Sequence, residues 1–243
     1  MARATGFGML RHVPSRRRKT KPRRLRLWRI VAGVVLFALL GSFLLVAPWR
    51  FVPLPITSFM LQSRFAADAP PLRYDWVPWT RISGNLALCA IASEDQKFPD
   101  HHGFDLDSIE KAVQGGARRG ASTISQQVAK NLYLWPGRSF VRKGIEAWLT
   151  VWIELLWPKK RILEVYLNIA EFGPGVYGAE AASAWAFGKR ADELTMQEAA
   201  TLVAVLPNPK RMSAKRPGPY VRERSRQIVR SAGQLGMGVL RKL

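Results

Sequence analysis

Two adjacent carboxylates stand at the end of an apolar stretch and raise the first chemical question. Residues 86–92 read LALCAIA, and Glu94 and Asp95 follow after a single serine, with Phe98 and His101 close behind. Acidic side chains are seldom buried without a partner, so this position is typical of a helix cap, a metal site or one half of an acid–base pair. The spacing alone leaves these three open.

A second polar stretch follows at residues 120–134, GASTISQQVAKNLYL. It carries hydroxyl, amide and amine groups on Ser122, Thr123, Gln126, Gln127, Lys130 and Asn131. With so many polar positions, we expect a helix with little apolar face.

A third stretch, residues 137–148, reads GRSFVRKGIEAW. Arg138 and Arg142 are four residues apart, as are Arg142 and Glu146, while Lys143 precedes Glu146 by three. Side chains at these intervals share one face of a helix. The sequence therefore predicts a face on which cations surround a glutamate.

Each stretch has a structural explanation when it is taken alone. Glu94 and Asp95 could cap a turn, the glutamines could be solvated, and an Arg142–Glu146 pair at a surface contributes only a few tenths of a kcal/mol. Histidines beside an exposed loop usually ligate nothing. Taken together, two glutamates on different helices with several cations between them favour a cleft that holds a polyanion while a carboxylate removes a proton.

The elements that position these residues begin with a membrane anchor. Residues 1–29 hold eleven Lys or Arg and no acid, out of a formal net charge of +21 over 243 residues. Residues 30–49, IVAGVVLFALLGSFLLVAPW, carry no charge and as a helix would span a bilayer core of roughly 30 Å. A cleaved signal peptide would have a shorter apolar core. The positive-inside rule then places residues 1–29 in the cytoplasm and the chain after Arg50 across the membrane.

The remaining chain divides into a connector, residues 50–84, and a folded domain, residues 85–243. The connector is rich in proline and holds a short amphipathic piece at Ser58–Phe65 that could lie on the membrane surface. Helical periodicity dominates the domain, and no alternating strand pattern of convincing length is present. The expected elements are helices at residues 140–157, 160–172 and 179–187, one after a Thr195–Glu198 capping box, and a basic amphipathic helix at residues 219–235. We expect the single cysteine, Cys89, to be a small buried apolar residue.

Four of these segments, in order, resemble the motifs of the peptidoglycan glycosyltransferases. They are EDQKFPDHHG from Glu94, GASTISQQVAKN from Gly120, RKGIE from Arg142 and RILEVYLN from Arg161. The resemblance covers about residues 86–209. This part of the chain is similar to glycosyltransferase family 51, which forms the polymerising domain of class A penicillin-binding proteins. Because no room remains for a transpeptidase domain, we expect the monofunctional, biosynthetic form. One departure is that the stretch between Asp105 and Gly120 looks shorter than in many relatives.

The resemblance implies a mainly α protein with a lysozyme-like all-α glycosyltransferase domain. It implies that lipid II, a disaccharide-pentapeptide on undecaprenyl pyrophosphate, is polymerised with inversion and release of the lipid pyrophosphate. Glu94 would be the general base, with Glu146 as the second catalytic carboxylate. The pyrophosphate would be stabilised by four cations, Lys130, Arg138, Arg142 and Lys143. Three further residues, Ser122, Gln126 and Gln127, would contact the pyrophosphate or the sugars. Supporting roles fall to Asp95, His101 and Asn131.

The resemblance requires no cofactor, although Glu146 could either orient the cations or hold a divalent ion such as Mg²⁺ or Mn²⁺. It implies lipid II, the growing glycan strand and membrane lipid as partners, and leaves division or elongation proteins open. The expected location is the bacterial inner membrane, crossed once, with the catalytic domain in the periplasm.

Two other classes of function compete with this interpretation. A lysozyme-like glycan hydrolase also uses paired carboxylates, but it must protonate an alcohol leaving group, whereas a basic cluster suits a pyrophosphate. A membrane-tethered nucleic-acid binder is suggested by charge alone. Since the predicted topology places the domain away from nucleic acid, we expect no nucleic-acid partner.

Overall fold

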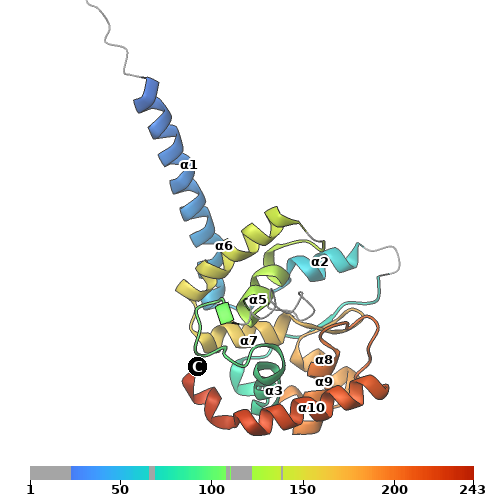
Figure 1. Cartoon of the computed structure of the whole chain (residues 1–243). Coiled ribbons are helices and arrows are strands. Elements are labelled where there is room, and N and C mark those ends of the chain that lie inside the picture. The colour runs from blue at the N-terminus through green and yellow to red at the C-terminus, as the bar shows by residue number, and fades with distance from the viewer. Residues whose placement is uncertain (1–22, 66–68, 108–109, 111–121, 138) are drawn as a thin grey trace, which may run out of the picture. The chain divides into compact units, whose positions relative to one another are not determined.

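The computed structural model describes residues 23–65, 69–107, 110, 122–137 and 139–243 (Figure 1). These residues form two compact units, one extending to Gly41 and the other running from Ser42 to Leu243. The first 22 residues of the predicted basic tail lie outside the described part of the chain, as do residues 108–109 and 111–121 of the Asp105–Gly120 stretch.

Helix α1, Arg23–Val46, is the expected membrane-spanning helix. The segment Leu27–Arg50 is long and apolar enough to cross a bilayer, and among the described helices it is the single one of this kind. Its apolar side chains are open to the surroundings; Phe37, for instance, is 80% exposed. Exposed apolar surface on this scale is unfavourable in water and favourable in lipid, which agrees with a single-pass anchor.

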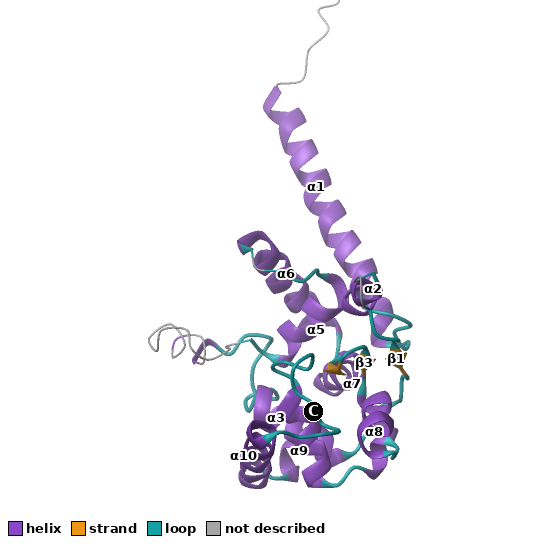
Figure 2. Cartoon of the chain, turned by 90° about the vertical axis from the view of Figure 1, so that its right-hand side faces the viewer, coloured by secondary structure: helices purple, strands orange, loops and turns teal. Residues whose placement is uncertain are grey.

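The second unit is built mainly from helices, which confirms the predicted fold class (Figure 2). Their bounds are α2 Ser58–Arg64, α3 Gly84–Glu94, α5 Ile124–Tyr133, α6 Phe140–Leu156, α7 Lys159–Ile169, α8 Ala179–Phe187, α9 Met196–Val205 and α10 Pro219–Leu235. Short 3₁₀ turns are η1 Ala47–Arg50, η2 Trp79–Arg81, η3 Ala191–Glu193 and η4 Met237–Lys242.

Two groups of helices supply most of the core. Helix α3 packs against α9 and α10, while α5 packs against α6 and α7. Residues 86–92 of α3 and 199–205 of α9 are all buried, because these two stretches carry almost only apolar side chains. Cys89 is buried in α3, as expected. The capping box at Thr195 and the basic amphipathic helix at residues 219–235 are also confirmed.

Helix α5 corrects one expectation. The sequence suggested little apolar face, yet the helix buries Ile124, Val128, Ala129 and Leu132 between α6 and α7. These positions follow intervals of four, one and three, so they form a single stripe. The prediction was wrong because short polar side chains also lie on the buried side, with Ser125 completely covered.

A small three-stranded sheet, which the sequence did not predict, joins the connector to the segment that follows α7. Its strands are β1 Arg73–Tyr74, β2 Glu171–Gly173 and β3 Val176–Tyr177, in the order β1-β3-β2, with β1 parallel and β2 antiparallel to β3. Strands of two or three residues show no usable alternation. The turn at Gly175 has φ +71°, and a Cβ atom there would lie 2.8 Å from the Pro71 carbonyl oxygen. Helix α7 ends at Ile169, before the predicted residue 172, because Ala170 is extended at φ −64° and ψ 140° and the chain enters β2.

Residues 50–84 do more than connect, because Leu54, Met60 and Val77 are buried in the same core. Arg161 of α7 fixes the start of this segment. Its guanidinium donates to the Trp49 carbonyl at 2.8 and 3.0 Å and to the Val52 carbonyl at 2.6 Å. Carbonyl groups at a helix end lack partners within the helix, and Arg161 supplies them.

Replacing Arg161 by Lys should destabilise the domain. Arg161 also pairs with Glu164 at 2.9 Å, and a single ammonium group cannot reproduce a planar fork that serves all of these acceptors. We expect a loss of about 2 kcal/mol, seen as a lower thermal midpoint of the detergent-solubilised protein. Arg190→Lys, at an exposed ion pair with Asp192, should leave the midpoint unchanged. Equal midpoints for the two variants would contradict this role.

Candidate active site

Glu94 is the last residue of α3, where the buried helix emerges at the surface. Asp95, the next residue, leaves helical geometry at φ −164° and ψ 78°, so the helix ends there. The Glu94 side chain is 15% exposed. Its Oε1 accepts a hydrogen bond from the Ser93 hydroxyl at 3.1 Å, and its Oε2 accepts one from the Gln127 amide at 3.2 Å. The carboxylate is thus held between α3 and α5 while part of it remains accessible.

Tyr166 of α7 fixes the orientation of Gln127. Its hydroxyl donates to the Gln127 Oε1 at 3.3 Å, which turns the amide nitrogen toward Glu94. Burial raises the pKa of Tyr166 well above its ordinary value, and the charges of Glu94 and Asp95 raise it further. The phenol therefore remains a hydrogen-bond donor. Tyr166 lies in the RILEVYLN motif, but it was not among the site residues expected from the sequence.

Arg224 of α10 is a second residue that sequence reasoning missed. Its Nη2 lies 3.8 Å from the Glu94 Oε1 and donates to the Ser93 hydroxyl at 3.2 Å. The residue comes 130 positions after Glu94, so no local spacing connects them. A signal was present, because Arg224 falls on the same face of the amphipathic helix as the buried Val221 and Ile228.

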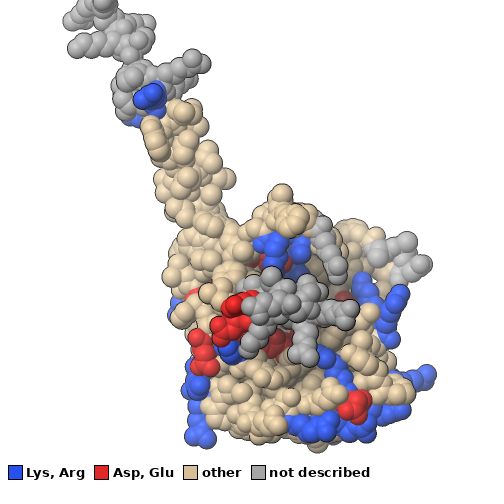
Figure 3. All heavy atoms as spheres, in the orientation of Figure 1, with Lys and Arg blue, Asp and Glu red and all other residues tan. Residues whose placement is uncertain are grey.

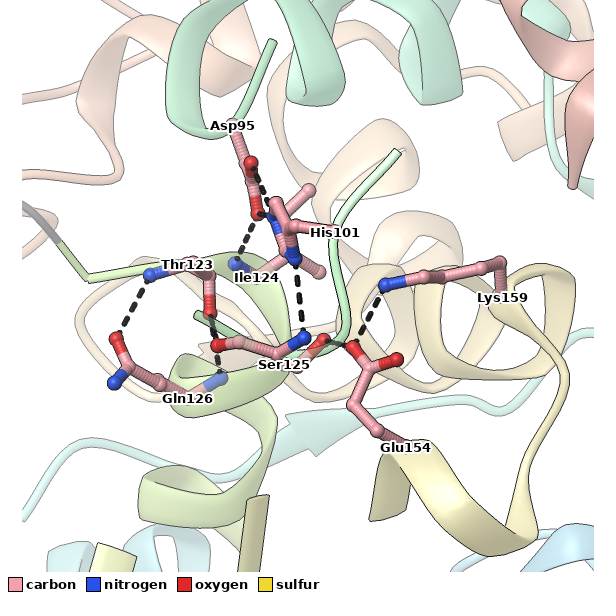
Figure 4. A network of polar contacts seen from close by, with 9 residues as sticks. Asp95, His101, Thr123, Ile124, Ser125, Gln126, Glu154 and Lys159 are labelled. Carbon is pink, nitrogen blue, oxygen red and sulfur yellow. Dashed lines mark hydrogen bonds and ion pairs between the residues drawn. The ribbon is translucent and has the colours of Figure 1, made fainter. Parts of the chain in front are cut away.

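Asp95 joins the end of α3 to the start of α5 (Figure 4). Its Oδ2 accepts a hydrogen bond from the Ile124 backbone N–H at 3.0 Å, and its two oxygens lie 2.9 and 3.0 Å from the His101 Nε2. His101 Nδ1 accepts from the Gly103 N–H at 3.1 Å, so the ring proton is on Nε2 and points at the carboxylate. Thr123 closes the network by donating to the Gly103 carbonyl at 2.7 Å.

Helix α5 begins with a capping box that uses Gln126. The Thr123 Oγ1 accepts from the Gln126 N–H at 3.2 Å, and the Gln126 Oε1 accepts from the Thr123 N–H at 3.1 Å. Gln126 is 4% exposed, so in this state its side chain serves the cap. Ser122 lies just before the cap and is exposed. Contacts of Ser122 and Gln126 with a substrate stay predictions.

A second buried link ties α5 to α6 and α7. Glu154 accepts hydrogen bonds from the Ser125 hydroxyl and, at 2.8 Å, from Lys159 (Figure 4). The Lys159 ammonium lies 4.6 Å from the centre of the Phe98 ring. Sequence reasoning named Phe98 but did not find this link, which brings together three distant segments.

The cations predicted from the third stretch gather around Glu146. Ser139 caps α6 by accepting from the Arg142 N–H at 3.1 Å, which places Arg142 and Lys143 in the first turn. Glu146 is 2% exposed; one of its oxygens lies 3.1 Å from an Arg142 nitrogen, and the other accepts from Lys143. Arg138 lies outside the described residues.

Lys130 of α5 belongs to the same electrostatic cluster. Burial lowers the pKa of Lys130 below the ordinary lysine value, while the charge of Glu146 opposes this shift, Arg142 and Lys143 add to it, and Glu94 opposes it more weakly. The charges of both glutamates therefore act on the pKa of Lys130. The structure brings both predicted glutamates and three of the four predicted cations into one region. Asn131 lines a cavity together with Lys130.

Neither the two glutamates nor the histidines form a metal centre in the described part of the chain. No three His, Cys, Asp or Glu side chains there are grouped so that they could hold a metal ion. Glu146, the candidate ligand, has both oxygens on cationic side chains. Its contacts are those of a residue that orients cations, and metal binding there stays a prediction.

Comparison with known proteins shows which family the chain belongs to. The family model described as Transglycosylase matches residues 64–232. The chain belongs to the transglycosylase family. Biosynthetic peptidoglycan transglycosylases of Pseudomonas fluorescens and Pseudomonas aeruginosa are each 50% identical over 218 residues, covering 86% of this chain and 91% and 94% of theirs. One of Xylella fastidiosa is 51% identical over 218 residues, covering 86% of this chain and 90% of its own. The transglycosylase match begins in α2, so it includes part of the predicted connector.

Replacing the Asp95 carboxylate by an amide should lower the stability of this transglycosylase. An asparagine offers one acceptor where two donors converge, so Asp95→Asn should cost about 2 kcal/mol of unfolding free energy. A double-mutant cycle with Asp95→Ala and His101→Ala should give a coupling of about 1–3 kcal/mol. Asp100→Asn, at an exposed pair with Lys242, is the matched control. Additive effects of the two alanine changes would contradict the link between them.

Proposed function

We propose that this transglycosylase polymerises lipid II into the glycan strands of the bacterial cell wall and releases undecaprenyl pyrophosphate. The observation that carries the proposal is that Glu94 shares one region with a cluster of cations on α5 and α6. A sugar hydroxyl needs a base, and a departing pyrophosphate needs positive charge. Membership of the transglycosylase family supports the same reaction.

Glu94 is the general base in this proposal. It removes the proton from the 4-hydroxyl of the incoming sugar as that oxygen attacks C1 of the growing strand. The bond between C1 and the pyrophosphate oxygen breaks, and the anomeric centre is inverted. Two donors, Gln127 and Ser93, hold the carboxylate so that it does not have to reorganise during the step. Arg224 reinforces this position from α10.

Lys130, Arg142 and Lys143 stabilise the leaving group. A pyrophosphate leaves without a proton when its growing charge is matched by fixed cations, and arginine can bind phosphate oxygens with two parallel hydrogen bonds. Glu146 is buried beneath these cations and holds two of them in place. Arg138 is assigned to the same group from the sequence alone.

The apolar surface just after α2 and at the start of α6 suits a substrate that is carried on a lipid. Phe65, Phe140 and Val141 are 81%, 98% and 73% exposed. Such side chains favour the boundary between headgroups and acyl chains. Together with α1, they fit a domain that works at the surface of the inner membrane. The excess of Lys and Arg before α1 supports a cytoplasmic N-terminus and a periplasmic domain.

A glycan hydrolase is less well supported by the same residues. It needs a protonated carboxyl group beside the leaving oxygen, in addition to the second carboxylate. Both oxygens of Glu146 contact cations, one Arg142 and the other Lys143, and these contacts suit a residue that orients cations better than one that donates a proton. The curated relatives are named as biosynthetic enzymes.

Glu94→Gln should abolish polymerisation of labelled lipid II by the solubilised protein. The amide keeps the size of the side chain but cannot accept the proton, so we expect a loss of at least about 10²-fold in rate with binding of lipid II retained. Products are separated by electrophoresis, and muramidase digestion verifies the strands. Glu193→Gln, at an exposed carboxylate of η3, should polymerise normally. Full activity of Glu94→Gln would exclude this residue as the base.

The alkaline side of the pH profile should depend on Lys130. Because burial lowers its pKa, Lys130 loses its proton, and its charge toward pyrophosphate, at a lower pH than an ordinary lysine. We expect kcat/KM to fall as the pH rises through this range. Lys130→Arg keeps its charge and should shift the decline to higher pH, even if its maximum is lower. The control is Lys97→Arg, beside the exposed Asp107. Identical alkaline limbs in wild type and Lys130→Arg would assign the decline to another group.

A further inference from the structure

A cavity of about 180 Å³ is lined in part by the residues that hold the base. Gln127 and Tyr166, which orient Glu94, form part of its wall, and Lys130 of the cation cluster forms another part. Glu171 and Asn131 add a carboxyl and an amide group. The cavity is therefore connected through shared side chains to both halves of the proposed reaction, although none of the steps proposed above uses Glu171.

Glu171 is an unusual residue for such a wall. It is the first residue of β2, and its Oε1 is buried with no hydrogen-bond partner among the described residues. Burial raises the pKa of Glu171, while the charge of Lys210 and the Gly175 N–H oppose the shift. A buried oxygen without a donor costs about 1–3 kcal/mol, so the folded chain retains an unfavourable feature that a ligand could relieve. The last torsion of a glutamate side chain is broad, so a small rotation can bring an oxygen to the cavity.

The remaining wall indicates the class of ligand. Phe59 and Tyr177 contribute aromatic surface, and the Lys130 ammonium lies 6.0 Å from the centre of the Phe59 ring. Burial raises the pKa of Tyr177 to about 12, so its hydroxyl remains protonated. A carboxylate repels phosphate, which argues against a second pyrophosphate position here. Aromatic surface with an amide, a carboxyl and hydroxyl groups matches an uncharged sugar that bears hydroxyl and acetamido groups.

We propose that Glu171 is a specificity-determining residue that accepts a hydrogen bond from a hydroxyl or acetamido N–H of a substrate sugar in this cavity. The proposal rests on the function argued above, because it places the sugar beside the cations that hold the pyrophosphate. It assigns recognition of the glycan to β2 and recognition of the leaving group to α5 and α6. The competing explanation is that Glu171 only stabilises the β2–β3 turn through Gly175.

The first experiment compares Glu171→Ala and Glu171→Gln with wild type in steady-state polymerisation of labelled lipid II. We expect Glu171→Ala to raise KM about 10-fold, equivalent to about 1.4 kcal/mol, with kcat changed less than about two-fold. Glu171→Gln retains an acceptor oxygen and should recover most of the loss. Glu223→Ala, which removes a carboxylate paired with Arg226 on the outer side of α10, should match wild type.

The second experiment measures binding without turnover, by calorimetry on the solubilised full chain. The probes are tetra-N-acetylchitotetraose, an uncharged sugar, and inorganic pyrophosphate. Glu171→Ala should weaken binding of the tetrasaccharide about 10-fold and leave binding of pyrophosphate unchanged. If Glu171→Ala does not fold, Glu171→Gln decides, with a smaller loss restricted to the tetrasaccharide.

Three outcomes would overturn the proposal. The first is an unchanged KM in Glu171→Ala, and the second is an equal loss of binding affinity for the tetrasaccharide and for pyrophosphate. The third is a fall in both kcat and the thermal midpoint of Glu171→Ala that is also seen in Glu171→Gln. The last of these is the result expected for a purely structural role in the turn. A wild-type protein that binds the tetrasaccharide through Glu171 but makes no strands from lipid II would support the sugar site. That result would overturn the proposed polymerisation alone.

Discussion

The site depends first on the carboxylate of Asp95. Its backbone N–H closes α3 on the Ile91 carbonyl at 3.0 Å, and its side chain accepts the first N–H of α5. One residue therefore ends one helix and begins another. A negative charge at a helix N-terminus is favourable, and His101 holds the carboxylate from the other side. Because Glu94 directly precedes Asp95, the direction of its side chain is determined by this junction.

The second constraint is electrostatic. Glu146 is buried, and a buried carboxylate is costly unless hydrogen-bonded cations surround it. Arg142 and Lys143 meet that requirement from the same helix, and Lys130 approaches from α5. The local balance of one carboxylate against three cations is positive and partly desolvated, so an anion gains more there than at an open surface. The wider positive charge lies elsewhere: Figure 3 shows basic side chains along the lower edge of this face, in the region of α10.

The sequence predicted those features that depend on neighbours along the chain. The cation face of α6, the capping box before α9, the amphipathic α10 and the position of Glu94 all follow from spacings of one to four residues. Features that depend on distant contacts were not predictable. Arg224 reaches Glu94 from α10, the two-residue strands form only because β1 is held against β3, and α5 has an apolar stripe hidden among polar residues that are themselves buried. In each case tertiary packing, not local preference, decides the outcome.

The two halves of the site differ in how far they are open to solvent, and this difference fits the two tasks. Around the base, Asp95, Gln126 and Tyr166 are buried and hydrogen-bonded, so the geometry needed for proton transfer exists before the substrate arrives. Among the cations, which Glu146 holds, Arg142 is 12% exposed and Lys143 is 47% exposed. Pyrophosphate departs as the bond to C1 breaks, so the cations that bind it must be reachable from solvent. A base held by buried residues beside more open cations therefore suits a reaction in which one substrate end must be aligned and the other must depart.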